Sequence, residues 1–246
     1  MLKKSTKPAT QPLRRSLVKA AVTITFLRVA SAVLIGLLFV SGCRQADTPS
    51  HAPATAADAG QTSRPKIVVL GDSLTAGLGI AANEAFPAVL QEHIDRARLN
   101  YEVVNAGVSG DTTAGGLRRL GWVLTPDTRL LIVALGANDG LRGLPVAEMK
   151  RNLTTIVATA RARGVPVLLA GMEAPPNFGP EYTAAFRQVY RDVAREQGVA
   201  VLPFLLEGVA GDSSLNQGDG IHPNAEGARR VAALVWRTLE PMLVTS

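Results

Sequence analysis

Residues able to bind metals or to form disulfides are scarce in this chain of 246 residues. It contains one cysteine, Cys43, and three histidines. An intramolecular disulfide is therefore excluded, and a cysteine- or histidine-based metal centre has too few ligands, so we expect no metal and no cofactor. His51 lies in a polar stretch, His93 lies in a charged helical pattern that predicts a solvated side chain, and His222 is the remaining histidine.

Acidic residues are absent from residues 1–42, which hold seven of the 26 basic residues. From residue 43 onward, 19 basic residues accompany 20 acidic ones, a net charge of −1. The overall charge of +6 therefore arises in the N-terminal segment, and the rest of the chain offers no basic stripe for nucleic acid. The sequence also lacks the motifs of nucleotide-binding proteins, because no G-x-G-x-x-G follows the first expected strand and no G-x-x-x-x-G-K-[ST] occurs.

The first 42 residues have the features of an export signal. Residues 1–19 are polar and basic, residues 29–40 form an apolar run, and Ser41 and Gly42 are small. This order predicts a signal peptide over residues 1–42, because the apolar run is short for a transmembrane helix. An uncleaved anchor that begins near Ala20 is the alternative, with Arg28 inside its span.

The sequence Val40-Ser41-Gly42-Cys43 resembles the lipobox of bacterial lipoproteins. That resemblance implies that Cys43 is lipidated, that it begins the mature chain, and that it holds an exported, periplasmic protein on a membrane. A chance cysteine after an ordinary signal peptide is the alternative. Residues 43–64 are rich in Ala, Thr, Pro and Ser and predict a flexible tether.

Residues 65–246 alternate apolar, β-rich runs with helical patterns, as expected for one domain with a large core. Such alternation predicts a three-layer α/β/α, flavodoxin-like fold with a five-stranded parallel sheet. The expected strands are residues 67–70, 101–105, 130–135, 165–170 and 199–204. The expected helices are residues 86–98, 112–124, 145–163, 179–197 and 224–239.

Polar, glycine-rich loops follow the first three expected strands and would meet at one edge of the sheet. Ser73 follows the first strand, where it is either a helix N-cap or a reactive hydroxyl. The loop before the last expected helix contains Asp219 and His222, three residues apart. A carboxylate at that spacing can accept the imidazole Nδ1–H and leave Nε2 free as a base. His222 could then deprotonate Ser73 if the fold brings the last loop beside the first.

Together these loops resemble the GDSL, or SGNH, hydrolase family. The family blocks occur in order as Gly71-Asp72-Ser73-Leu74, Asn105-x-Gly107-x-x-Gly110-Asp111-Thr112, Gly136-x-Asn138-Asp139 and Asp219-Gly220-Ile221-His222-Pro223-Asn224. The resemblance covers essentially residues 66–240. It is greatest to the bacterial periplasmic branch of multifunctional acyl-CoA thioesterases, lysophospholipases and arylesterases.

The resemblance implies a serine esterase that cleaves small-molecule carboxylic esters or thioesters through an acyl-enzyme. It implies that Ser73 is the nucleophile, that His222 is the general base and that Asp219 orients it. It also implies an oxyanion hole made by the N–H groups of Ser73 and Gly110 and the side-chain amide of Asn138. The type of each group agrees with this chemistry, because neutral, preorganised donors stabilise a tetrahedral oxyanion.

Several points stay open at the level of the sequence. Gly107 competes with Gly110 as an oxyanion donor, and Asp72, Asp111 and Asp139 are expected to be structural. The alternatives to an esterase are a deacetylase of acylated envelope sugars and a catalytically silent envelope lipoprotein. A monomer is favoured.

Overall fold

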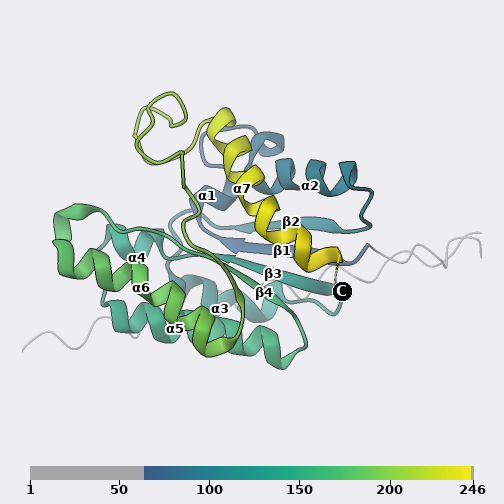
Figure 1. The fold of residues 1–246 in the computed structure, drawn as a ribbon, viewed down its shortest axis with the longest axis horizontal. Helices are drawn as coiled ribbons and strands as arrows, with labels where there is room; N and C mark the ends of the chain where they lie inside the picture. Colours follow the sequence, from purple (N-terminus) through teal and green to yellow (C-terminus); the bar gives the residue numbers. More distant parts are fainter. Residues whose placement is uncertain (1–63, 245–246) are drawn as a thin grey trace, which may run out of the picture. The chain divides into compact units, whose positions relative to one another are not determined.

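The computed structural model describes residues 64–244. The expected signal peptide, the lipidation of Cys43 and almost the whole tether fall outside these residues. Five strands form one parallel sheet in the order β2-β1-β3-β4-β5 (Figure 1). The strands are β1 (Lys66–Gly71), β2 (Glu102–Gly107), β3 (Thr128–Ala134), β4 (Val167–Ala170) and β5 (Ala200–Leu202). The predicted α/β class is confirmed, and this strand order is the flavodoxin-like one.

Helices cover both faces of the sheet, which gives three layers (Figure 1). On one face α2 (Phe86–Arg96) packs against α7 (Ala225–Val244). On the other face, α5 (Val146–Ala162) packs against both α3 (Thr113–Val123) and α6 (Pro180–Gln197). Shorter elements lie in the loops, namely α1 (Ser73–Ala76), α4 (Ala137–Leu141) and the 3-10 turns η1 (Ala82–Glu84) and η2 (Pro176–Phe178).

The middle of the sheet is buried on both faces. Residues 67–70 of β1 and residues 130–135 in and after β3 are all buried. These runs are continuously apolar rather than alternating, as is typical of a parallel sheet between two helical layers. The result is a rigid central platform whose carboxyl edge supports the loops.

The expected boundaries hold to within two residues in every expected strand and helix except α7. β5 ends at Leu202 rather than at residue 204, and Pro203 follows it, which has no N–H to continue the ladder. α2 ends at Arg96, and Arg98 then adopts a left-handed φ of 57°. α7 runs through Pro241 to Val244, beyond the expected end at residue 239. The short α1 and α4 were not predicted, because four or five residues carry too little periodicity.

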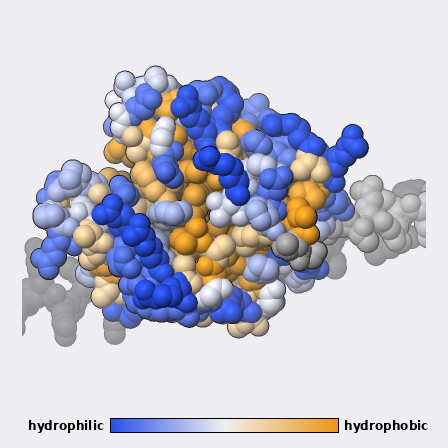
Figure 2. Space-filling view, in the orientation of Figure 1, coloured by the Kyte–Doolittle hydropathy of each residue, from blue (hydrophilic) through white to orange (hydrophobic). Residues whose placement is uncertain are grey.

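Hydrophobic surface lies between α6 and α7, whereas the outward face of α6 is hydrophilic (Figure 2). This pattern follows from an amphipathic helix that turns its apolar stripe toward the sheet. Within residues 64–244, no helix has both the length and the hydrophobicity that crossing a membrane requires.

Candidate active site

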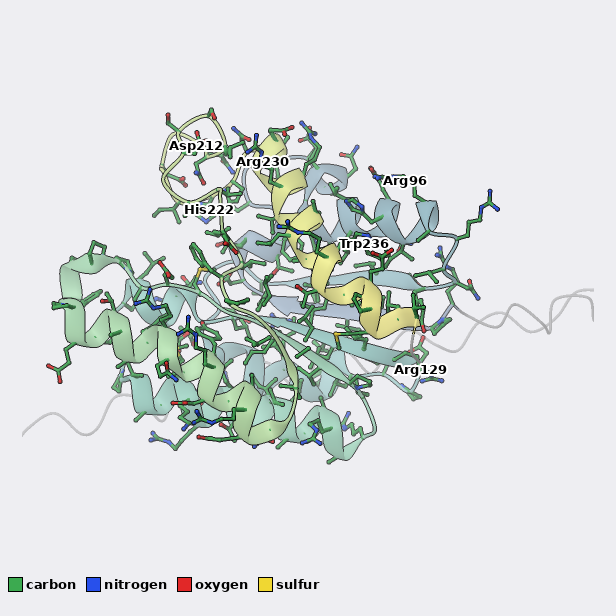
Figure 3. All side chains as sticks on the ribbon, in the orientation of Figure 1. Arg96, Arg129, Asp212, His222, Arg230 and Trp236 are labelled. Atoms are coloured by element: carbon green, nitrogen blue, oxygen red, sulfur yellow. The ribbon has the colours of Figure 1, made fainter. Side chains whose placement is uncertain are left out.

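The loops singled out in the sequence meet at the carboxyl edge of the sheet. Ser73 begins α1 directly after β1, Gly110 follows β2, and Asn138 lies in α4 after β3. His222 lies just before α7. In Figure 3, His222 lies toward one end of the domain and Arg129, near the start of β3, toward the other. The candidate site therefore lies at the edge where ligands bind in open α/β sheets.

Three side chains form a hydrogen-bonded chain at this edge. The Ser73 Oγ lies 2.9 Å from the His222 Nε2. The His222 Nδ1 lies 2.6 Å from the Asp219 Oδ2. The other carboxylate oxygen, Asp219 Oδ1, accepts the backbone N–H groups of Ile221 and His222 at 2.9 and 3.0 Å. Residues 149 positions apart are thus brought into direct contact.

The hydrogen bonds to Asp219 determine how this chain is protonated. The backbone N–H of His222, its imidazole and the N–H of Ile221 hold the pKa of Asp219 well below its usual range. Asp219 is therefore a carboxylate and an acceptor, which keeps the imidazole proton on Nδ1. The His222 Nε2 is then the acceptor for the Ser73 hydroxyl, and this arrangement can remove the hydroxyl proton.

Asp72 fixes the turn on which Ser73 lies. Its Oδ1 accepts the Leu74 N–H at 3.0 Å and caps α1. The carboxyl group is buried, and burial raises its pKa to about 6, although the hydrogen bond from Leu74 and the charge of His222 oppose the rise. Asp72 has the structural position that the sequence predicted for it.

The two glycines that compete as oxyanion donors differ in their surroundings. The Gly107 N–H already donates to the Asn105 Oδ1 at 3.0 Å. A Cβ at Gly107 would lie 2.3 Å from the Ala76 backbone nitrogen, so its peptide is packed against α1. Gly110 is exposed with a φ of 84°, and none of the described residues accepts its N–H. The Gly110 N–H is therefore the one open to an incoming ligand.

Asn138 presents its amide from α4. Its Nδ2 donates to the Asp111 carbonyl oxygen at 3.0 Å and approaches the Asp72 Oδ2 at 3.4 Å. The bond to Asp111 fixes the orientation of the amide. The contact with Asp72 is long for a hydrogen bond, so the second amide hydrogen is only weakly engaged.

Asp111 and Asp139 act as the loop-fixing acceptors that the sequence predicted. Asp139 is buried and accepts the Thr113 N–H at 2.8 Å and the Thr113 hydroxyl at 2.6 Å. Burial raises the pKa of Asp139, and these hydrogen bonds oppose the rise. The Asp111 Oδ2 accepts the Arg119 Nε–H at 2.7 Å. The two carboxylates tie the loops after β2 and β3 to α3.

Sequence reasoning missed three residues that hold these loops together. Arg119 also donates to the carbonyl oxygens of Ala106 at 2.7 Å and Gly71 at 2.8 Å. The Gln217 Nε2 donates to the Leu78 carbonyl oxygen at 2.7 Å and so links the first loop to the last. The Arg142 Nη2 donates to a backbone carbonyl of the loop after β2. No sequence pattern reveals these bonds, because apart from the Arg119–Asp111 pair they end on backbone oxygens that any residue supplies.

The solvated position expected for His93 is wrong. Its ring stacks on Trp236 with centroids 5.7 Å apart, and the side chain is half-buried. Burial and the nearby Arg96 lower its pKa. The helical pattern was interpreted correctly, but α7 covers that side of α2. Between residues 64 and 244, no group of three or more His, Cys, Asp and Glu side chains is placed to hold a metal ion.

The cavity beside Ser73 and His222 is apolar and small. Its volume is about 10 Å³, which is room for about one water molecule. Its apolar lining includes Leu74, Ile80, Phe86, Leu206 and Val231. A substrate bound at Ser73 can place only a small group inside, and its remainder must lie over the open edge.

Comparison with known proteins agrees with the resemblance seen in the sequence. Residues 69–230 match the profile of the GDSL-like Lipase/Acylhydrolase family. Esterase TesA from Pseudomonas aeruginosa is 44% identical over 184 residues, which cover 74% of this chain and 92% of that protein. Thioesterase 1/protease 1/lysophospholipase L1 from Escherichia coli is 37% identical over 178 residues, or 72% of this chain and 84% of that one.

Solved structures agree as well. The crystal structure of TesA superposes with a TM-score of 0.70 at 44% identity and covers 72% of this chain and 99% of that one. AlinE4, described as an SGNH-hydrolase family esterase, gives a TM-score of 0.62 at 40% identity, with 75% and 99% of the two chains covered. By its sequence match, its relatives and its fold, this chain belongs to the GDSL-like lipase/acylhydrolase family.

Proposed function

We propose that this protein is a serine esterase that hydrolyses small-molecule carboxylic esters or thioesters through an acyl-enzyme. The observation that carries the proposal is the hydrogen-bonded chain from Asp219 through His222 to Ser73 at the carboxyl edge. Relatives named as an esterase, an arylesterase and a thioesterase/lysophospholipase support it.

In the first half of the proposed reaction, the Ser73 Oγ attacks the acyl carbonyl carbon while the His222 Nε2 takes the hydroxyl proton. The tetrahedral intermediate then collapses, and His222 returns that proton to the leaving oxygen or sulfur as the alcohol or thiol departs. In the second half, water attacks the acyl-serine, His222 takes a proton from it, and the acid leaves as the proton returns to Ser73. Asp219 stays ionised throughout and stabilises the imidazolium.

The oxyanion of each tetrahedral intermediate would be bound by three neutral donors. These are the N–H groups of Ser73 and Gly110 and the Asn138 Nδ2. The unused N–H of Gly110 supports its role over that of Gly107, whose N–H is taken by Asn105. The hydrogen bond from the Asn138 Nδ2 to the Asp111 carbonyl oxygen fixes the orientation of the amide. The other Nδ2 hydrogen makes only the long contact with Asp72, and this hydrogen would be donated to the developing oxyanion.

We further propose that residues 1–42 are a signal peptide and that lipidated Cys43 anchors the exported protein to a membrane in the periplasm. Residues 43–64 would then tether a catalytic domain of residues 65–246. The basic N-terminus, the short apolar run and the lipobox-like Val40–Cys43 support this arrangement. The family match over residues 69–230 supports the placement of the domain.

The function is tested by hydrolysis of a p-nitrophenyl ester series from acetyl to palmitoyl. The unmodified chain is compared with Ser73→Ala and with Ser213→Ala, a matched control for an exposed serine in the last loop. We expect the control to retain full activity and Ser73→Ala to lose at least 10³-fold, as in other serine hydrolases. Retained activity in Ser73→Ala contradicts the proposal, as does a folded, unmodified chain that cleaves no ester or thioester.

A further inference from the structure

Most of the exposed large hydrophobic side chains surround the candidate active site. Seven such side chains are exposed among residues 64–244, and five of them lie in loops at the carboxyl edge. We call these five, which are 40–48% exposed, the apolar rim: Leu78, Val108, Leu141, Phe178 and Ile221. The other two, Trp122 and Val244, lie at the far ends of α3 and α7, both of which begin at the carboxyl edge.

Three rim residues are joined directly to the site. The Leu78 N–H donates to the Ser73 carbonyl oxygen at 3.1 Å, and the Val108 N–H donates to the Gly71 carbonyl oxygen at 3.0 Å. Ile221 immediately precedes His222, and its N–H donates to Asp219. Leu78 also lines the cavity beside Ser73. The three residues therefore lie on the first, second and last loops of the carboxyl edge.

The other two rim residues extend the apolar surface past α4. Leu141 is the last residue of α4, which also carries Asn138. Phe178 lies in η2 against Gly143, where a Cβ would come within 2.5 Å of the phenyl ring. The rim thus comes from five different loops around one serine. Single exposed hydrophobic residues are ordinary, but a group gathered at one site indicates a binding surface.

The small cavity explains why a substrate would need this surface. Its volume of about 10 Å³ beside Ser73 cannot hold an acyl chain of several methylenes. The apolar part of a long-chain ester must therefore stay at the open edge, where the rim is.

We propose that the apolar rim docks onto lipid aggregates, so that the enzyme takes amphipathic esters from the surface of a micelle or bilayer. This inference rests on the proposed esterase function and adds the form in which its substrate is presented. A hydrocarbon surface has no fixed shape and accommodates five separate side chains. A protein partner needs a continuous patch of complementary shape.

The charges near the rim indicate which kind of lipid surface it binds. Glu207 and Asp212 are exposed acidic residues on the loop after β5, whereas Glu173 is paired with Arg187 at 3.3 Å. Arg142 is the exposed cation beside Leu141. A surface of this kind gains nothing from anionic headgroups, so docking is to neutral or zwitterionic lipid and is insensitive to salt.

The test compares two forms of substrate in the full chain. p-Nitrophenyl acetate is supplied as a monomer, and p-nitrophenyl palmitate is supplied in neutral mixed micelles. The rim variant carries Leu141→Gln together with Phe178→Gln, and Trp122→Gln is the matched control because Trp122 is exposed away from the rim. We expect the rim variant to lose at least 10-fold on micelles and less than 2-fold on the acetate, with the control unchanged on both.

Other outcomes overturn the inference. An equal loss on dissolved, monomeric p-nitrophenyl octanoate and on the micelles makes the rim an acyl-chain site for a single molecule. No loss on micelles removes the rim from recognition. If the unmodified chain hydrolyses the micellar ester faster when anionic lipid is added, docking is electrostatic. If the rim variant and the unmodified chain differ in mass by light scattering, the rim is a contact between copies of the chain. If the unmodified chain hydrolyses neither ester, the proposed function itself fails. If the unmodified chain hydrolyses the acetate and the rim variant hydrolyses the micellar ester at the same rate as the unmodified chain, only the docking surface is contradicted.

Discussion

The Arg142 guanidinium donates a hydrogen bond to the Gly110 carbonyl oxygen at 2.9 Å. Arg142 caps the C-terminal end of α4, and Asn138 lies one turn earlier in the same helix. The short helix α4 therefore carries one proposed oxyanion donor, Asn138. Through Arg142 it also positions the peptide group next to the other proposed donor, the Gly110 N–H. This relationship connects the loops after β2 and β3 across the candidate site.

Replacing Arg142 with Gln should lower kcat by about 5- to 10-fold and leave KM almost unchanged. Gly110 would keep its N–H but lose the bond that positions it, so the cost should be below the roughly 2.7–4 kcal/mol of a lost donor. Steady-state kinetics on one soluble ester provide the measurement. Arg142→Lys should recover part of kcat, and Arg151→Gln on α5 is the control for loss of an exposed arginine. A rise in KM alone would show that Arg142 binds substrate instead.

Asp219→Asn should reduce turnover by about 10⁴-fold, and His222→Ala by about 10⁶-fold, as for the same roles in serine proteases. The amide can still face the imidazole, but it no longer stabilises the imidazolium or selects the tautomer, whereas alanine removes the base. Turnover numbers for both variants are compared with Asp212→Asn, which changes an exposed aspartate in the same loop. The reverse order would remove Asp219 from the proposed mechanism.

Asp72 should make the folded state less stable as pH rises from about 4 to about 6. Burial raises its pKa from 3.8 to about 6, so in that window the folded state holds a proton that the unfolded chain has released. The free energy of unfolding therefore falls with rising pH, by at most about 3 kcal/mol at roughly 1.4 kcal/mol per pKa unit. This contribution is fully present below pH 4 and is lost above pH 6.

Asp72→Asn isolates the effect, because the amide oxygen can still cap α1 but cannot ionise. Denaturant unfolding at several pH values should give a flatter curve for the variant between pH 4 and pH 6. His93, whose pKa is lowered, contributes equally to both proteins. Parallel curves for the two proteins would mean that Asp72 ionises as easily in the folded state as in the unfolded chain.

Cys43→Ala should release the protein from membranes, because the proposed acyl chains would have no attachment point. Fractionation of cells into soluble and membrane material measures this directly. Ser41→Ala keeps a small residue before the cysteine and should leave the distribution unchanged. If the Cys43→Ala protein stays with the membranes, the lipobox interpretation fails and the uncleaved anchor that begins near Ala20 is supported instead.

The parts of the fold that the sequence predicted are those fixed by hydrophobic pattern and chain order. Residues 67–70 and 130–135 are continuous apolar runs, so their place inside a parallel sheet could be predicted. The rule that parallel strands place their carboxyl ends together then brought Ser73, Gly110 and Asn138 to one edge. The contact between Ser73 and His222 depended on the family resemblance, because periodicity does not reveal which loops touch.

What the sequence could not predict depends on backbone atoms and on exposure. Arg119, Arg142 and Gln217 bond to carbonyl oxygens whose positions exist only in the folded chain. The half-buried position of His93 depends on where α7 crosses α2. The apolar rim could not be predicted as one group, because its five residues are far apart in the sequence and each is ordinary by itself.

The most direct test of the central claim is the mass of the enzyme trapped during turnover of a p-nitrophenyl ester. Rapid acid quenching followed by peptide mass spectrometry should find one acyl group, carried by the peptide that contains Ser73, together with a burst of p-nitrophenol close to one per enzyme. Ser73→Ala should give neither the adduct nor the burst. An acyl group on another residue, or hydrolysis without any covalent adduct or burst, would contradict the acyl-enzyme on Ser73.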